Sequence, residues 1–156
     1  MKKSLLIIGL AFAASSAFAH IGWTYKQCVQ QYGKPFNHTV RYGLNFYDFS
    51  AHGVLIAEAF DDGYVVSVSY FALQSALDVK LAMKLIDKAA PNLTWDNATE
   101  VNNTAEWRGY YHGQYAVYAQ ASVYQGSKGP GVKIQVTRAE YGGRFDSIEG
   151  DLADQL

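Results

Sequence analysis

The spacing of apolar residues predicts two short amphipathic helices. In the first, apolar side chains recur at steps of three and four residues, as along one face of a helix: they are Tyr25, Cys28, Val29 and Tyr32. Thr24 and Gln27 stand at the spacing of a capping box, in which each side chain satisfies a free backbone N–H group at the helix start. Gly33 and Pro35 are typical of a helix end. We therefore expect a helix that starts after Thr24 and ends at Gly33.

The second predicted helix opens at Ser75, has Asp78 at capping-box spacing, and ends at Pro91. Its apolar stripe comprises Leu77, Leu81, Ala82, Leu85, Ile86 and Ala89. Its opposite side carries Lys80, Lys84 and Lys88. Because a single apolar stripe usually packs on the helix's own protein, we expect this helix to dock on a sheet rather than on a membrane or a partner.

Alternating apolar and polar residues indicate strands in both halves of the chain. The first half contains three predicted strands, at 41–49, 54–60 and 64–71. The second half contains three more, at 105–111, 114–124 and 132–137. Asp61-Asp62-Gly63 favours a hairpin turn, because Asp and Gly tolerate a positive φ. The segment 92–104 is polar and is expected to form a loop.

The two halves share one order of elements, a capped helix and then three strands. This order predicts an α+β fold of two αβββ units, with an antiparallel sheet and both helices packed on one face. We expect a single domain over 20–141, built from pseudo-repeats at 22–71 and 75–141. The acidic segment 142–156 is expected to be a loosely ordered tail.

The N-terminal segment 1–19 has the pattern of a secretory signal peptide. Lys2 and Lys3 precede an apolar run, and Ala17-Phe18-Ala19 is a small-x-small cleavage signal. We expect cleavage after Ala19, a periplasmic or secreted mature chain, and no integral membrane segment after that cleavage.

The charge balance argues against nucleic acid as a partner. The chain has 13 basic and 14 acidic side chains, and cleavage would remove two of the lysines. No basic block remains that could follow a phosphate backbone. Cys28 is the single cysteine, so no internal disulfide can form, and its place on the apolar stripe predicts a small buried side chain.

No pattern predicts a catalytic, cofactor or metal site. His20 would become the mature N-terminus, where its amine and imidazole could chelate copper only together with a second histidine. His38, His52 and His112 are scattered over predicted loops and turns. Asp48, Asp61 and Asp62 lack the spaced acidic ligands of a calcium loop. The glycine-rich segment 126–131 lacks the Gly-Lys-Ser/Thr ending of a phosphate-binding loop. We therefore expect no cofactor and a protein that is not an enzyme.

The region of the first helix resembles the SmpA/OmlA family of small bacterial envelope proteins. Gly22, Thr24, Gln27, Gly33 and Pro35 match its Gly-Met-Thr-x-x-Gln-x-x-x-x-x-Gly-x-Pro pattern, with Trp23 in place of Met. The segment 60–65 is similar to its Phe-x-x-Gly-x-Val hairpin. No Cys follows Ala19, so a lipid anchor is not expected. The tandem arrangement is similar to the β-lactamase inhibitor protein fold, in which two such units form a concave sheet that grips a partner protein.

Aromatic residues mark the candidate binding site. They fall on or beside the strands of the second half: Trp107, Tyr110, Tyr111, Tyr118 and Tyr124. Tyr118 and Tyr124 share a strand face with Gln120 and Ser122. Tyrosine supplies contact area and one polar atom at low entropic cost, which suits a binding face. The alternative is that these residues only reflect the high strand propensity of aromatic side chains.

The sequence therefore favours a non-enzymatic protein-binding module with an exposed aromatic sheet face, of the kind found in an inhibitor or an envelope-assembly accessory. The alternative is a small secreted enzyme or ligand carrier, with a pocket between helices and sheet that His52 or Asp48 would line. The oligomeric state is open, and Cys28 or an edge strand could mediate dimerisation.

Overall fold

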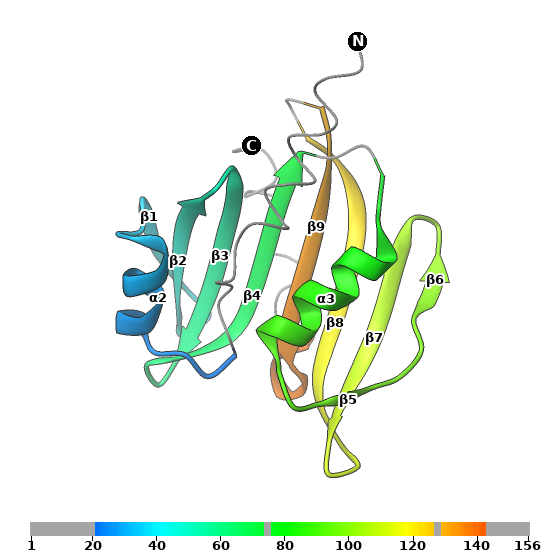
Figure 1. Ribbon diagram of the computed structural model, residues 1–156. Coiled ribbons are helices and arrows are strands. Elements are labelled where there is room, and N and C mark those ends of the chain that lie inside the picture. The colour runs from blue at the N-terminus through cyan, green and yellow to red at the C-terminus, as the bar shows by residue number, and fades with distance from the viewer. Residues whose placement is uncertain (1–20, 74–75, 127–128, 143–156) are drawn as a thin grey trace.

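The computed structural model describes residues 21–73, 76–126 and 129–142. They form one antiparallel sheet of nine strands in the order β1-β2-β3-β4-β9-β8-β7-β5, with β6 also paired to β7 (Figure 1). The helices are α2 (Tyr25–Tyr32), α3 (Val79–Ala89) and the short 3-10 helix η1 (Ala139–Tyr141). The strands are β1 (Asn37–Arg41), β2 (Leu44–Ala51), β3 (Val54–Asp61), β4 (Tyr64–Leu73), β5 (Thr94–Trp95), β6 (Thr99–Val101), β7 (Thr104–Tyr111), β8 (Gln114–Gly126) and β9 (Gly129–Arg138).

The predicted α+β fold, with two αβββ units and two helices packed on one face of the sheet, is wrong. The structure is mostly a nine-stranded antiparallel sheet with two short helices of 8 and 11 residues. Four strands follow α2, and five follow α3. The sequence pattern misses β1, β5 and β6, because these edge strands bury few side chains and so show little apolar alternation.

The predicted capping box of α2 is confirmed. Thr24 Oγ1 accepts a hydrogen bond from Gln27 N (3.4 Å), and Gln27 Oε1 accepts one from Thr24 N (2.8 Å). Gly33 follows the helix at φ 84°, a conformation that favours glycine. Only Cys28 of α2 is fully buried, so this helix contributes little to the core.

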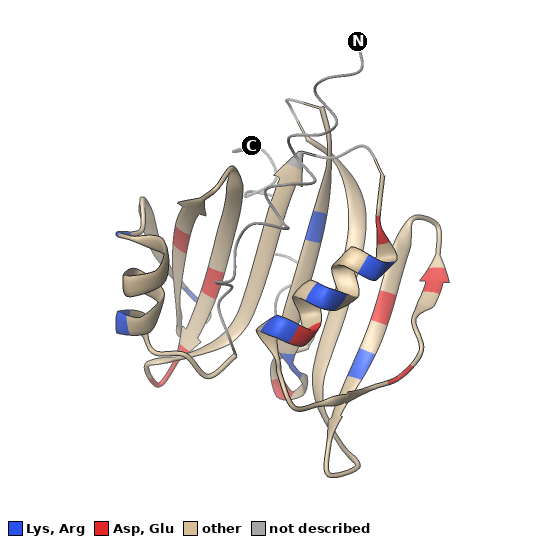
Figure 2. Ribbon diagram, viewed as in Figure 1, with Lys and Arg blue, Asp and Glu red and all other residues tan. Residues whose placement is uncertain are grey.

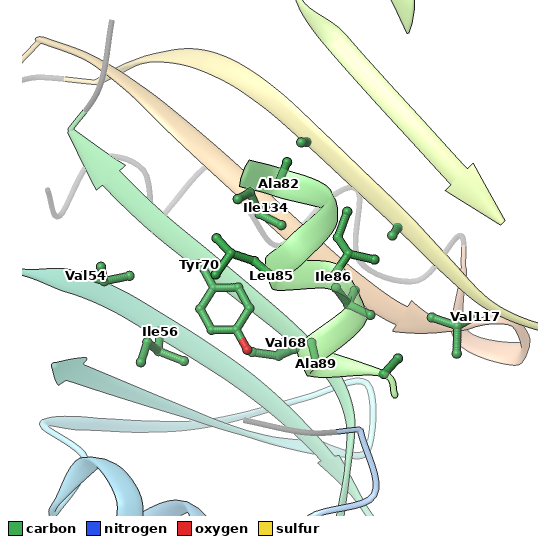
Figure 3. Packing of buried hydrophobic residues seen from close by; sticks show 14 of the residues in the cluster. Val54, Ile56, Val68, Tyr70, Ala82, Leu85, Ile86, Ala89, Val117 and Ile134 are labelled. Carbon is green, nitrogen blue, oxygen red and sulfur yellow. The ribbon is translucent and has the colours of Figure 1, made fainter. Parts of the chain in front are cut away.

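Helix α3 begins later than its sequence pattern predicts. Its N-cap is Asp78, whose Oδ1 accepts a hydrogen bond from Leu81 N (3.0 Å), and the predicted start at Ser75 lies outside the described residues. Figure 3 shows Leu85, Ile86 and Ala89 packed against residues of the sheet. The lysines of α3 gather on its side away from the sheet (Figure 2), where Lys80, Lys84 and Lys88 are exposed.

The sheet joins the two halves of the chain along β4 and β9, in a register that runs from Ser67 opposite Thr137 to Leu73 opposite Gly131. We call the side of the sheet that contacts α3 the α3 face. One row of buried residues crosses six strands on it: Phe49, Ile56, Tyr70, Ile134, Ala121 and Ala105. This row forms the centre of the hydrophobic core.

The opposite side, which we call the second face, has a row of polar residues, interrupted by one alanine, in the neighbouring register. It comprises Asn37, Asp48, Ala57, Ser69, Gln135, Gln120, Glu106 and Thr99. Its middle members on β4 and β9 are buried, whereas those on β7 and β8 are partly exposed. Polar side chains on this face are therefore accessible in the second half of the chain.

Among the described residues, no helix is long and apolar enough to span a membrane. The predicted signal peptide 1–19, its cleavage site, and the predicted tail from 143 onward lie outside the described residues.

Candidate functional site

The structure separates the five aromatic residues that the sequence singles out. Trp107 lies on the α3 face and is only 3% exposed, within the main core. Its ring is therefore not available to a partner. Tyr111 is exposed at the end of β7, next to the turn at His112 and Gly113, and its ring contacts the His112 ring.

Tyr124 lies on the second face but has a packing role. Its ring contacts Phe71 with centroids 6.0 Å apart, and it packs against Leu55 and Ala57. A Cβ atom built on Gly131 would meet the Tyr124 ring at 2.5 Å, so the ring lies directly over that glycine. Burial raises the pKa of the Tyr124 hydroxyl. Substitution of Tyr124 would therefore disturb the fold as well as any binding surface.

Tyr118 and Tyr110 lie on the second face where that face is partly exposed. Tyr118 stands opposite Arg108 in the register of β7 and β8. The Gln120 amide donates to the Tyr118 hydroxyl oxygen (3.2 Å) and to Glu106 Oε1 (3.1 Å). These hydrogen bonds connect three side chains of the face and restrict their rotamers.

The structure adds Tyr115 to this group. A β-bulge at Gly109 and Tyr110 places Tyr110 opposite Tyr115, with Ala116 as the extra residue on β8. Their rings lie 6.1 Å apart, and Tyr115 is exposed. Strict alternation would have put Tyr115 on the face opposite to Tyr118, which is why the sequence pattern misses it.

We call this group the β7–β8 patch; it comprises Glu106, Arg108, Tyr110, Tyr115, Tyr118 and Gln120. Arg108 is exposed, and its backbone N–H group donates to Asp96 Oδ1 (2.7 Å), which holds the loop before β6 against β7. Burial raises the pKa of the Tyr115 hydroxyl, and the Arg108 guanidinium opposes part of that rise. Tyr115 therefore remains a neutral donor at physiological pH.

The patch brings hydroxyl, amide, carboxylate and guanidinium groups together on two adjacent strands. Within the described ranges, no three or more His, Cys, Asp or Glu side chains gather as metal ligands would. Cys28 is the fully buried residue of α2, and burial raises the pKa of its thiol well above the usual value. Cys28 is therefore not an activated nucleophile, and its depth also prevents an intermolecular disulfide.

A cavity of about 390 Å³ lies beside the start of α3. Its lining includes Leu77, Val79, Glu100, Asn103, Thr104 and Val123. The residues expected to line a ligand pocket lie elsewhere. Asp48 is on the second face, where it accepts a hydrogen bond from Asn37 Nδ2 (2.7 Å), and His52 is in the turn between β2 and β3 at φ 53°.

No protein-family model and no curated protein matches the chain. Among solved structures, it is similar to a cysteine-rich secretory protein from Staphylococcus aureus, with 13% identity, a TM-score of 0.42, and coverage of 77% of this chain and 45% of that one. It is also similar to an extracellular protein with an SCP domain from Bacillus anthracis, with 11% identity, a TM-score of 0.42, and coverage of 81% and 47%. The chain spans less than half the length of either structure, and a likeness this distant carries no argument about function.

Proposed function

We propose that this chain is a secreted or periplasmic, non-enzymatic module that binds another protein through the β7–β8 patch. The observation that carries the proposal is a set of accessible tyrosines and one arginine on two adjacent strands, with Tyr118 held by a hydrogen bond from Gln120. Tyrosine and arginine are the residue types that most often dominate protein interfaces.

The position of the patch on paired strands supports this proposal. The backbones of β7 and β8 are fixed by their register, and Tyr118 already has a hydrogen-bonded rotamer. A surface that is ordered before binding loses little conformational entropy when the partner docks. Arg108 favours a partner with a carboxylate at the contact, since guanidinium groups bind carboxylates in a bidentate manner.

The finer role that we propose is an inhibitor or an envelope-assembly accessory. It is supported by the resemblance of the segment 22–35 to SmpA/OmlA proteins. The sequence pattern of a signal peptide supports a site of action outside the cytoplasm.

The test is capture of a partner from a periplasmic or secreted extract by the purified protein. We compare it with an Arg108→Ala/Tyr118→Ala variant, which leaves the packed Tyr124 in place. Truncation of a single hot-spot side chain costs about 2 kcal/mol, so with at least one hot spot in this pair we expect the affinity for an isolated partner to fall by about thirtyfold or more. Tyr64→Ala is the matched control, because Tyr64 is an exposed tyrosine of the first half.

Thermal melts of both variants must match that of the unsubstituted protein, so that lost capture reports the surface and not the fold. A partner that binds the double variant and the Tyr64→Ala control equally well would refute the role of the β7–β8 patch.

The cavity beside α3 favours a second candidate function, that of a ligand carrier. Its volume would admit a small organic molecule, and Leu77, Val79 and Val123 give it an apolar side. A thermal-shift screen against small apolar molecules tests this candidate. Ligands that stabilise the unsubstituted protein but not a cavity-filling Val123→Phe variant would support it.

A further inference from the structure

Strand β1 is the outermost strand at one edge of the sheet (Figure 1). It is joined to β2 by the two-residue turn Tyr42-Gly43, where φ is 53° and 79°. In such a hairpin the flanking residues, here Arg41 and Leu44, form a hydrogen-bonded pair. Alternation then directs the backbone N–H and C=O groups of Thr39 toward β2, and those of His38 and Val40 away from the sheet.

The two edges of the sheet differ in how they are protected. At the far edge, β7 is flanked by β5 and β6, which are only two and three residues long. Very short edge strands limit pairing with other chains. In the described part of the chain, no strand pairs with the outer side of β1. This strand has neither a proline nor a bulge between 38 and 41, and Arg41 is its single charged residue.

Apolar side chains are also concentrated at this edge. Phe36, Val40 and Tyr42 are 54%, 63% and 69% exposed. Helix α2 lies at this edge and packs on β2 (Figure 1), where the Tyr25 ring lies 4.7 Å from the Tyr47 ring, but it leaves these three side chains largely exposed. His38 stacks on Tyr47 at 4.3 Å and remains exposed on its outer side.

We propose that two copies of this chain pair through β1, antiparallel and centred on Thr39, to form a symmetric dimer with one continuous sheet. In this register the outward backbone groups of His38 in each copy meet those of Val40 in the other. Thr39 faces Thr39, and Asn37 faces Arg41, so no like charges oppose each other. A two-fold axis makes such an interface self-complementary, because each copy offers the same strand.

The side chains of β1 suit this register. Val40 of one copy packs beside the His38–Tyr47 stack of the other, which removes its exposed surface from water. Phe36 at one end of the segment is brought alongside Tyr42 of the second copy. Paired β-branched and aromatic side chains stabilise adjacent antiparallel strands.

The dimer is weak and concentration-dependent, because five residues span only about 17 Å and bury a small interface. It leaves the β7–β8 patch of both copies accessible, since this patch lies near the opposite edge of the sheet (Figure 1). The dimer would then present two such surfaces. The pairing itself rests on β1 alone and does not depend on the proposed function.

Sedimentation equilibrium over a wide range of protein concentrations tests the proposal. The unsubstituted protein should show a monomer–dimer equilibrium. Val40→Lys should weaken it by about tenfold or more, because a charge is introduced twice in a symmetric interface. Val101→Lys is the matched control: Val101 is an exposed valine on the edge strand β6, 59% exposed, and its substitution should leave the equilibrium unchanged.

A charge-swap pair tests the register. In a mixture of the Val40→Lys and His38→Glu variants, the introduced lysine of one chain would face the introduced glutamate of the other, so we expect heterodimers to form more tightly than either variant dimerises alone. A protein that stays monomeric at every concentration overturns the proposal, even if it binds a foreign extended peptide at β1. A dimer that Val40→Lys leaves intact overturns it as well.

Discussion

The carboxyl group of Glu58 lies inside the core on β3, and the residue is 0% exposed. The Cys28 thiol and the Tyr70 ring are its neighbours. Burial raises the pKa of Glu58 to about 7, and the neighbouring Cys28 thiol offsets only part of that rise. The native protein therefore favours the neutral acid at this position.

This shift predicts how stability depends on pH. In the unfolded chain Glu58 titrates near its ordinary value of 4.5, whereas in the native protein it titrates near 7. Between these values the native state retains a proton that the unfolded state has released, so the free energy of unfolding falls as pH rises. The loss from this group approaches about 3 kcal/mol and is complete above pH 7. Denaturant unfolding measured across this pH range checks it.

Glu58→Gln is the matched variant, because it keeps the shape of the side chain and removes its titration. Its free energy of unfolding should vary less between these pH values than that of the unsubstituted protein. Equal pH dependence in the two proteins would mean that Glu58 does not titrate in this window.

At the scale of elements, local signals define the helices but not the edges of the sheet. The capping box of Thr24 and Gln27 is a contact between residues three positions apart, so its prediction needs no tertiary information. The bulge on β8 is different. It depends on how β7 and β8 are aligned, and it moves Tyr115 to the same face as Tyr118.

The cap of α2 gives an element-scale prediction. Thr24→Ala removes the hydroxyl that accepts from Gln27 N, so the free energy of unfolding should fall by about 1 kcal/mol. Thr24→Ser retains a hydroxyl and should lose much less. Chemical denaturation followed by circular dichroism compares the two, and an equal loss in both variants would show that the hydroxyl is not what stabilises the helix start.

At the scale of the whole molecule, β4 and β9 hold the two halves in one sheet. On the second face of this junction, the hydroxyl groups of Ser67 and Thr137 are 2.7 Å apart and buried. Gln135 Nε2 also donates to Thr137 Oγ1 (3.3 Å). Residues 70 positions apart in the chain thus satisfy each other's polar groups at the centre of the sheet.

Thr137→Val tests this junction. The substitution keeps the shape but leaves the Ser67 hydroxyl and the Gln135 amide without their shared partner, at a cost of about 1–3 kcal/mol. We expect one cooperative unfolding transition at lower denaturant, since both halves contribute to one core. Thr99→Val, at an exposed strand position, should be close to neutral. Two separate transitions would instead indicate that the halves unfold independently.

Alternation along a strand predicts part of the candidate site but not all of it. Tyr118 and its neighbour Gln120 follow simple alternation along one strand, so their shared face is predicted correctly. Trp107 is also an aromatic residue on a strand, so the sequence pattern does not distinguish it from an exposed tyrosine. The structure places it on the face that α3 covers. Arg108 and Glu106 come onto the β7–β8 patch through their pairing with Tyr118 and Gln120.

The sequence by itself determined the features that depend on near neighbours: the cap of α2, the apolar stripe of α3, and the alternation of the long central strands. Only the tertiary structure decided the nine-stranded sheet, the side of Tyr115, the junction of β4 with β9, and the burial of Glu58 and Trp107. The physical reason is distance along the chain. Capping and periodicity are set by residues a few positions apart, whereas register and burial depend on segments that meet only when the sheet has formed.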